Sequence, residues 1–187
     1  MMGGLILSGC KRQEMPKPYA YARLDYQKTP HKTCQLPGFP CRFDYPDFFL
    51  INEKPSGKPT TRWVDFSWPA YGVTLSTTYQ RTEGRFNAEE QAERMAGLLR
   101  EKLPMYATLN TTLLILSDST LKAYLFEVKG STSIPLEFLI TDGKQHLFQG
   151  IVQFDQVPNR DALADILDGL NADMRRLITS FTFTPTP

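Results

Sequence analysis

The spacing of apolar and polar residues predicts two strands joined as a hairpin near residue 70. Apolar side chains alternate with polar ones in RWVDFSW and again in GVTLSTTYQ, the pattern of half-buried strands. Pro69 to Gly72 separate the two runs and favour a turn between antiparallel strands. The residues expected on the shared buried face are Val64, Phe66, Trp68, Val73, Leu75, Thr77 and Tyr79.

Further apolar runs predict four more strands in the second half of the chain. They are TLLILS, LKAYLFEV, IPLEFLIT and KQHLFQGIVQF. Asp142-Gly143 separates the last two, and Asp-Gly between apolar runs is a strong hairpin signal. The region 19–51 is aromatic and interrupted by prolines, so it predicts only one or two short extended segments.

A helical period predicts two amphipathic helices, one from Asn87 to Leu103 and one from about Arg160 to Thr179. Asn87 is a favourable N-cap, and Glu90 follows it by three residues, as in a capping box. The apolar stripe of the first helix contains Ala88, Ala92, Met95, Leu99 and Leu103. The stripe of the second contains Leu163, Ile166, Leu167, Leu170, Met174, Leu177 and Ile178. Late Arg175 and Arg176 suit the helix dipole.

The order strands, helix, strands, helix predicts an α+β fold. We expect a curved, mainly antiparallel sheet, because hairpin turns join its strands, with both long helices packed on it by their apolar stripes. The predicted boundaries give a single domain over residues 19–181 and a loose tail over 182–187.

Composition and charge narrow the class of protein. The chain has 187 residues, of which 41% are hydrophobic and 22% charged, and its formal net charge is +1. These values are ordinary for a globular domain and show no basic surplus for binding nucleic acid. No stretch approaches the length of apolar residues that spans a bilayer.

The N-terminal LSGC has the form of a lipobox, in which a lipoprotein signal ends and its cysteine, Cys10, carries the lipid. We expect residues 1–9 to be the remnant of a signal peptide, because the apolar run is too short for a complete one. Residues 10–18 would form the lipidated cysteine and a polar, proline-bearing tether. The alternative is an ordinary cysteine, which would leave an odd thiol in an exported chain.

Cys34 and Cys41 flank QLPGFP, in which Pro37-Gly38 favours a tight turn. The two cysteines are either free thiols or joined by a disulfide, since an oxidising compartment would allow the bond to form. A zinc site from His31, Cys34 and Cys41 is a weak alternative because it supplies only three ligands at an untypical spacing.

Motifs of catalysis and of cofactor binding are missing from the sequence. It contains no G-x-G-x-x-G, G-x-x-x-x-G-K-[ST], G-x-S-x-G or H-E-x-x-H. We expect His146 to face solvent at the start of a strand, and the Ser117–Ser119 segment to form a turn. A hydrolase would need a nucleophile beside His31 or His146. We therefore expect no enzyme, no cofactor and no metal.

Aromatic residues are abundant near the N-terminus. Tyr19, Tyr21, Arg23 and Tyr26 are interleaved in PYAYARLDY. Tyrosine and arginine are favoured anchors of protein interfaces, so these four are a candidate interface. The alternative is that the segment packs along the sheet as part of the fold.

Several stretches together resemble the gliding motility-associated lipoproteins of the GldD family, from the Bacteroidetes phylum. They include PKPYAYARLDY, FPCRFDYP, WVDFSWPAYGVTLSTTY and FLITDGKQHLFQGIVQF, and the likeness runs from Cys10 to about Phe181. Only the lipidated Cys10 carries over as a site, whereas Cys34 and Cys41 depart from the family pattern. The order of elements is also similar to the PsbP-type sandwich, an analogy of fold alone.

The resemblance implies a lipid anchor in the cell envelope, facing the periplasm or the surface. It also implies a role in gliding and in the type IX secretion system, through contacts with other envelope proteins. An alternative function is binding of a small molecule or glycan in a cleft beside the sheet. A deep apolar pocket that contains a few convergent polar groups would favour this alternative.

Overall fold

Most of the chain forms two antiparallel sheets and two long helices. The computed structural model describes Tyr26 and residues 30–159, 161 and 163–184. The strands of the larger sheet are β3 (Leu50–Lys54), β4 (Thr61–Trp68), β5 (Val73–Arg81), β6 (Thr108–Leu114), β7 (Lys122–Lys129), β8 (Leu136–Thr141) and β9 (His146–Phe154). Those of the smaller sheet are β1 (His31–Cys34), β2 (Cys41–Pro46) and β10 (Thr182–Phe183). The helices are α1 (Ala88–Lys102), α2 (Ala164–Ser180) and the short 3₁₀ helix η1 (Pro69–Tyr71).

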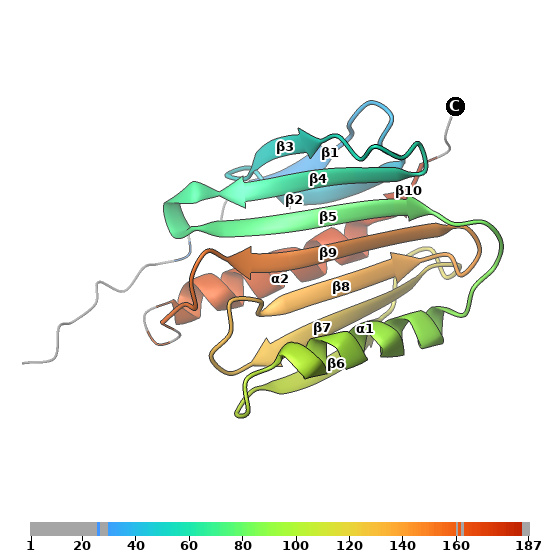
Figure 1. Cartoon of the computed structure of the whole chain (residues 1–187). Coiled ribbons are helices and arrows are strands. Elements are labelled where there is room, and N and C mark those ends of the chain that lie inside the picture. The colour runs from blue at the N-terminus through green and yellow to red at the C-terminus, as the bar shows by residue number, and fades with distance from the viewer. Residues whose placement is uncertain (1–25, 27–29, 160, 162, 185–187) are drawn as a thin grey trace, which may run out of the picture.

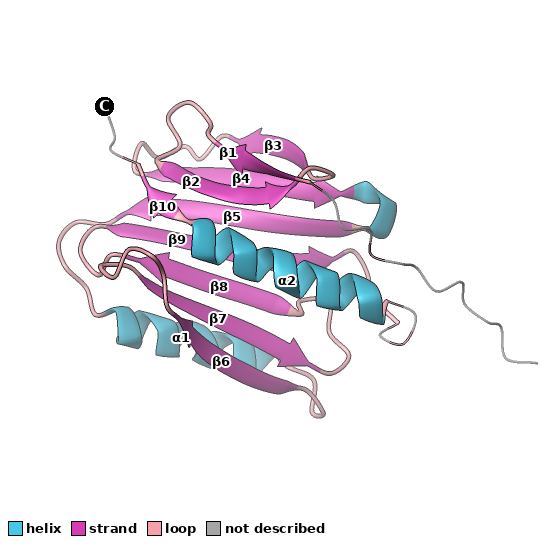
Figure 2. Cartoon of the chain, turned by 180° about the vertical axis from the view of Figure 1, so that it is seen from behind, coloured by secondary structure: helices cyan, strands magenta, loops and turns pink. Residues whose placement is uncertain are grey.

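The larger sheet is open, and its strand order is β3-β4-β5-β9-β8-β7-β6. Every neighbouring pair in it is antiparallel. The helices lie on opposite faces: α1 crosses in front of β6 and β7 in Figure 1, and α2 crosses the other face in Figure 2. The smaller sheet, ordered β1-β2-β10, lies on the same face as α2. The predicted α+β fold is confirmed.

The β4–β5 hairpin forms where the alternating pattern placed it. Phe66 faces Leu75 across the pair, and both are fully buried. Thr77 is a buried polar residue of the same face, and its hydroxyl donates to the Val64 carbonyl at 2.7 Å. The turn closes through Gly72, whose left-handed φ of 58° suits a residue without a Cβ.

Helix α1 begins with the predicted cap. The Asn87 side chain accepts from the backbone N–H groups of Glu89 and Glu90, at 2.9 and 3.3 Å. Four of the five predicted stripe residues are buried, together with Ala96, while Leu103 forms the C-cap. They pack on a core from the adjoining strands that contains Tyr124, Phe126, Leu139 and Leu147. The helix is therefore held by its apolar face.

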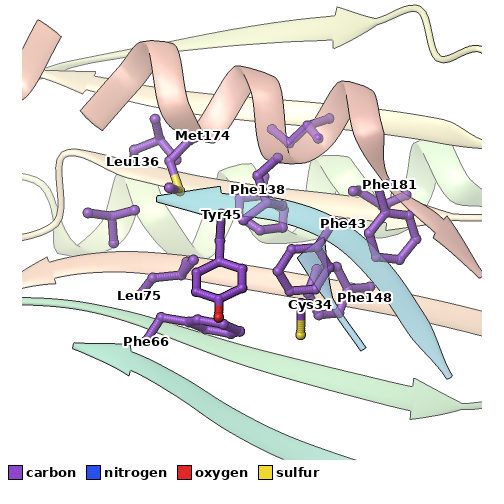
Figure 3. Packing of buried hydrophobic residues seen from close by; sticks show 14 of the residues in the cluster. Cys34, Phe43, Tyr45, Phe66, Leu75, Leu136, Phe138, Phe148, Met174 and Phe181 are labelled. Carbon is purple, nitrogen blue, oxygen red and sulfur yellow. The ribbon is translucent and has the colours of Figure 1, made fainter. Parts of the chain in front are cut away.

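The larger core lies between the sheet and the layer of α2 and β2. Phe43 of β2 stands in its centre, with ring centroids 5.4 Å from Phe148 and 6.1 Å from Phe181 (Figure 3). Met174 projects from α2 toward the sheet residues around Leu136 in the same view. All five of these side chains are buried. Burial of aromatic and aliphatic area on this scale is the main force holding the second layer to the sheet.

Several element boundaries differ from the predicted ones. The described residues of region 19–51 hold β1, β2 and the start of β3 rather than one or two segments, and β6 begins at Thr108, ahead of TLLILS. Helix α2 starts at Ala164, and its N-cap Leu163 makes no side-chain capping hydrogen bond. The loose tail was predicted to start at residue 182, but Thr182 and Phe183 pair with β2. Two residues are too short for an alternating pattern, so tertiary pairing alone marks this strand.

Candidate functional site

A cavity of about 140 Å³ lies between α2 and the larger sheet. Its lining residues come from β7, the start of β8, β9 and α2: Glu127, Val128, Lys129, Pro135, Leu136, Val152, Leu167, Asp168, Leu170, Asn171 and Met174. The buried Leu136, Val152 and Met174 make it apolar at depth. The volume is close to that of an engineered cavity that holds one benzene ring, about 150 Å³. The cavity therefore has room for a ligand of single-ring size.

A polar network forms one wall of this cavity. Asn171 donates to one Glu127 oxygen, and Arg175 donates to the other, with Nη2 to Oε2 at 2.8 Å. The Arg175 Nε also donates to the Asn171 Oδ1 at 2.9 Å. The two α2 residues are one turn apart, so both reach the same carboxylate on β7. The network fixes the position of α2 on the sheet, and its members satisfy one another.

Sequence reasoning missed this wall. The available signal was Glu127, a charge within the otherwise apolar strand run LKAYLFEV, matched by Asn171 and Arg175 spaced four apart on a helix. Arg175 and Arg176 were assigned to the helix dipole, but both form ion pairs instead. Arg175 pairs with Glu127, and Arg176 pairs with Asp44 at 3.3 Å.

A second, wider hollow of about 370 Å³ lies beside the start of α1. Charges of both signs line it: Arg85, Glu89, Lys122, Asp142 and Lys144. Lys122 and Glu89 form an ion pair. Asp142 accepts from the backbone N–H groups of the three residues that follow Gly143. The ion pair joins the start of α1 to β7, and the Asp142 hydrogen bonds hold the turn before β9 in place.

The two described cysteines are buried thiols of the smaller sheet, and no disulfide joins them. Burial raises the pKa of the Cys34 thiol to about 12. Burial likewise raises the pKa of Cys41 well above its ordinary value. Both side chains therefore stay protonated near neutral pH, which disfavours them as nucleophiles or metal ligands.

His31 joins the first strand of the smaller sheet to α2. Its Nε2 and the Asp173 Oδ1 are hydrogen-bonded at 2.9 Å. Burial raises the pKa of Asp173 to about 6, and the Arg176 guanidinium opposes that shift. His31 and Cys34 are three residues apart on one strand, so they point to opposite faces. Because these two side chains point in opposite directions, they cannot bind one zinc ion together, and the structure does not support the zinc alternative.

His146 was expected to face solvent, and the structure corrects this. Its Nδ1 and the Tyr79 hydroxyl are hydrogen-bonded at 2.8 Å. Its ring centroid lies 5.1 Å from that of Phe183, which belongs to β10. The C-terminal strand therefore covers the histidine, a contact that sequence spacing could not indicate.

Tyr26 packs within the fold. Its ring makes edge contacts with Phe48 and Trp68, at centroid distances of 6.1 and 6.0 Å. A Cβ placed on Gly169 of α2 would lie 2.2 Å from the Cγ of Tyr26, so the tyrosine ring lies directly against the helix at this glycine. The structure thus favours, for Tyr26, the alternative of packing as part of the fold. Tyr19, Tyr21, Arg23 and the lipidation residue Cys10 lie outside the described residues.

Apolar residues gather at one edge of the larger sheet. Met105, Tyr106, Leu113 and Ile115, in and around β6, are exposed, and so is Leu98 of α1. They make up five of the nine exposed large hydrophobic residues in the described part of the chain, which marks this edge as a candidate contact surface. Sequence reasoning missed it because it placed a strand on TLLILS without deciding which strand lay at the edge.

The architecture defines an α+β protein whose open antiparallel sheet carries one helix on each face. No helix among the described residues combines the length and hydropathy needed to cross a bilayer. The chain belongs to the gliding motility lipoprotein GldD family, whose family model matches residues 11–183. Membership of a lipoprotein family implies a membrane-anchored place in the cell envelope.

Comparison with solved structures shows a likeness to a cyanobacterial protein. It is the solution structure of PsbP (CyanoP) from Synechocystis sp. PCC 6803, at 15% sequence identity and a TM-score of 0.49. The likeness covers 82% of this chain and 92% of that chain. No curated protein matches the sequence.

Proposed function

We propose that this chain is a lipid-anchored envelope protein that supports gliding motility, and the type IX secretion system linked to it, through contacts with other envelope proteins. The family match over residues 11–183 carries the proposal. The anchor would be the lipid on Cys10, and the folded domain would present contact surfaces, of which the apolar β6 edge is one. Catalysis has no part in this proposal.

The arrangement of titratable groups supports a binding role over a hydrolytic one. His31 and His146 lie against Asp173 and Tyr79, and their contacts join separate elements of the fold. The thiols of Cys34 and Cys41 are buried and protonated near neutral pH. An acyl-transfer site needs an activated nucleophile within hydrogen-bond reach of a base. The hydroxyl that faces His146 belongs to Tyr79, and burial raises the pKa of this hydroxyl, so it is not activated as a nucleophile.

The size of the cavity beside α2 weighs against the binding of a glycan in that cavity. Ligand pockets commonly enclose roughly 300–1,000 Å³. The cavity beside α2 encloses about 140 Å³, and the Glu127–Asn171–Arg175 network already satisfies its polar wall. A saccharide of several rings would have to displace α2 to enter.

A clean deletion of the gene in a gliding, secreting host tests the proposal. We expect the deletion to abolish colony spreading and to reduce the type IX substrates in the medium, measured by mass spectrometry. The wild-type gene should restore both. Unchanged spreading and secretion in the deletion strain would refute the proposed role, and a pull-down from detergent-solubilised envelope would then identify other partners.

A further inference from the structure

The two edges of the larger sheet differ in how they are protected. Strand β3 has five residues, includes Glu53 and Lys54, and is followed directly by Pro55. Charged side chains, prolines and short length are common devices that stop an edge strand from pairing with another chain. The β3 edge therefore has all three protective features: charged side chains, a proline and a short length.

The β6 edge has none of these devices. The strand spans seven residues, and no charged side chain occurs from Leu103 through Ser117. Within the described part of the chain, β7 is its one pairing neighbour, so its outer N–H and C=O groups face away from the sheet. Backbone groups in such a row are a ready template for an added strand.

Apolar side chains surround this open edge. Leu113 within the strand is 60% exposed, and Ile115 just beyond it is 93% exposed. Tyr106, which precedes the strand, is 90% exposed. Helix α1 lies over β6 and β7, at the lower end of the sheet in Figure 1, so the edge also borders a helix. A monomer seldom leaves an uncharged edge strand and its apolar flanks open to water.

We propose that two copies of this chain pair through their β6 strands, antiparallel about a two-fold axis, to form one continuous sheet. The lack of charge favours a second copy as the occupant, because in a two-fold antiparallel pair any charge near the middle of the strand would lie beside its own copy and be repelled. Strand β6 carries no charged side chain, so this repulsion is absent. A two-fold axis also generates the antiparallel direction, so each copy supplies the same surface.

Side-chain positions support this pairing. Leu109 and Leu113 are four residues apart and share the face on which α1 lies, where Leu109 packs against the α1 core. When the seven residues of each strand pair in full, Leu113 of one copy lies opposite Leu109 of the other. Each copy's exposed Leu113 is therefore covered by Leu109 of the other copy, once at each end of the paired strands. Both α1 helices then lie on the same face of the joined sheet.

The molar mass in solution tests the proposal. The full 187-residue chain, produced without lipid, is measured by size-exclusion chromatography with light scattering up to roughly 100 µM. We expect twice the chain mass of 21.3 kDa for the wild type. Leu113→Lys should weaken the dimer by at least about tenfold and give the mass of one chain, because two lysines would then lie in the interface. The matched control is Leu50→Lys on β3, at 61% exposure, which should remain dimeric.

Hydrogen exchange locates the interface independently of the variants. Amides of residues 108–114 should exchange more slowly in the wild-type dimer than in the monomeric variant. Ile115→Lys, at the most exposed of these apolar positions, replaces Leu113→Lys if that variant fails to fold. A wild type with the mass of one chain throughout would overturn the proposal. A dimer lost in Leu50→Lys but kept in both β6 variants would also overturn it, as would β6 amides whose exchange does not change.

Discussion

Glu137 shows how burial sets the behaviour of a single residue. It lies on β8, paired with Phe126 of β7 and Ile151 of β9, so its cross-strand neighbours are apolar. Burial raises the pKa of its carboxyl from 4.5 to about 7, and Lys102 opposes that shift. Because the folded state binds this proton more tightly than the unfolded state, the contribution to stability is present at acid pH and is lost as the pH rises from about 4.5 to about 7.

Replacing Glu137 with glutamine should remove that loss. We expect the variant to match the wild type at pH 4 and to be more stable at pH 8 by about 1–2 kcal/mol, after allowance for solvent screening. Urea unfolding followed by circular dichroism at both pH values measures the difference. Glu127→Gln is the matched control and should lower stability at pH 8, because that carboxylate accepts from Asn171 and Arg175. Equal stability of Glu137→Gln and the wild type at both pH values would contradict the prediction.

At the scale of elements, the two long helices each contain a glycine with a different role. A Cβ on Gly97 of α1 would meet nothing within 4 Å, whereas one on Gly169 of α2 would strike the Tyr26 ring at 2.2 Å. Gly97 therefore only weakens its helix, while Gly169 lets the chain at Tyr26 approach α2 closely. The same residue type is tolerated in one helix and required in the other.

Alanine at these two positions should have opposite effects. Gly97→Ala should stabilise the protein by roughly 0.5–1 kcal/mol through helix propensity. Gly169→Ala should destabilise it by about 1–2 kcal/mol, because the cost of overpacking against the Tyr26 ring exceeds the gain in helix propensity. Chemical denaturation gives both values. In a Tyr26→Ala background the ring is gone, so Gly169→Ala should stabilise the protein through helix propensity, as Gly97→Ala does. If Gly169→Ala were stabilising with Tyr26 present, the close contact between Tyr26 and Gly169 would be contradicted.

At the scale of the whole molecule, the described fold joins the two ends of the domain. Strand β10 pairs with β2, and Phe181 packs on Phe43 and Phe148 in the core. The segment KRQEMPKP that follows Cys10 is polar and proline-bearing, a composition that does not pack into a core. We therefore predict that anchoring and folding are separable functions of this chain.

Cys10→Ser in the native gene should leave the melting temperature of the domain unchanged. The variant should move from the membrane fraction to the soluble fraction and should take up no labelled palmitate, because its acylated thiol is gone. Fractionation with immunoblotting measures the shift. Cys34→Ala is the control and should remain membrane-bound, since its thiol is buried. Retention of Cys10→Ser in washed membranes would contradict the lipid anchor.

Local patterns in the sequence determined the class of fold. Period-two and period-3.6 spacing identified the β4–β5 hairpin, both helices and the N-cap at Asn87, because each depends on residues close along the chain. The family resemblance also followed from contiguous stretches such as FLITDGKQHLFQGIVQF. The sequence likewise indicated a lipidation residue, Cys10, through one short motif.

Tertiary structure alone decided the features that join distant residues. The cavity wall joins Glu127 to Asn171 and Arg175, His146 is covered by Phe183, and Tyr26 lies on Gly169. The position of β6 at an open edge likewise depends on the order of all seven strands. Sequence spacing fixes which face of an element is apolar, but the neighbour that covers that face is set by packing across the whole molecule.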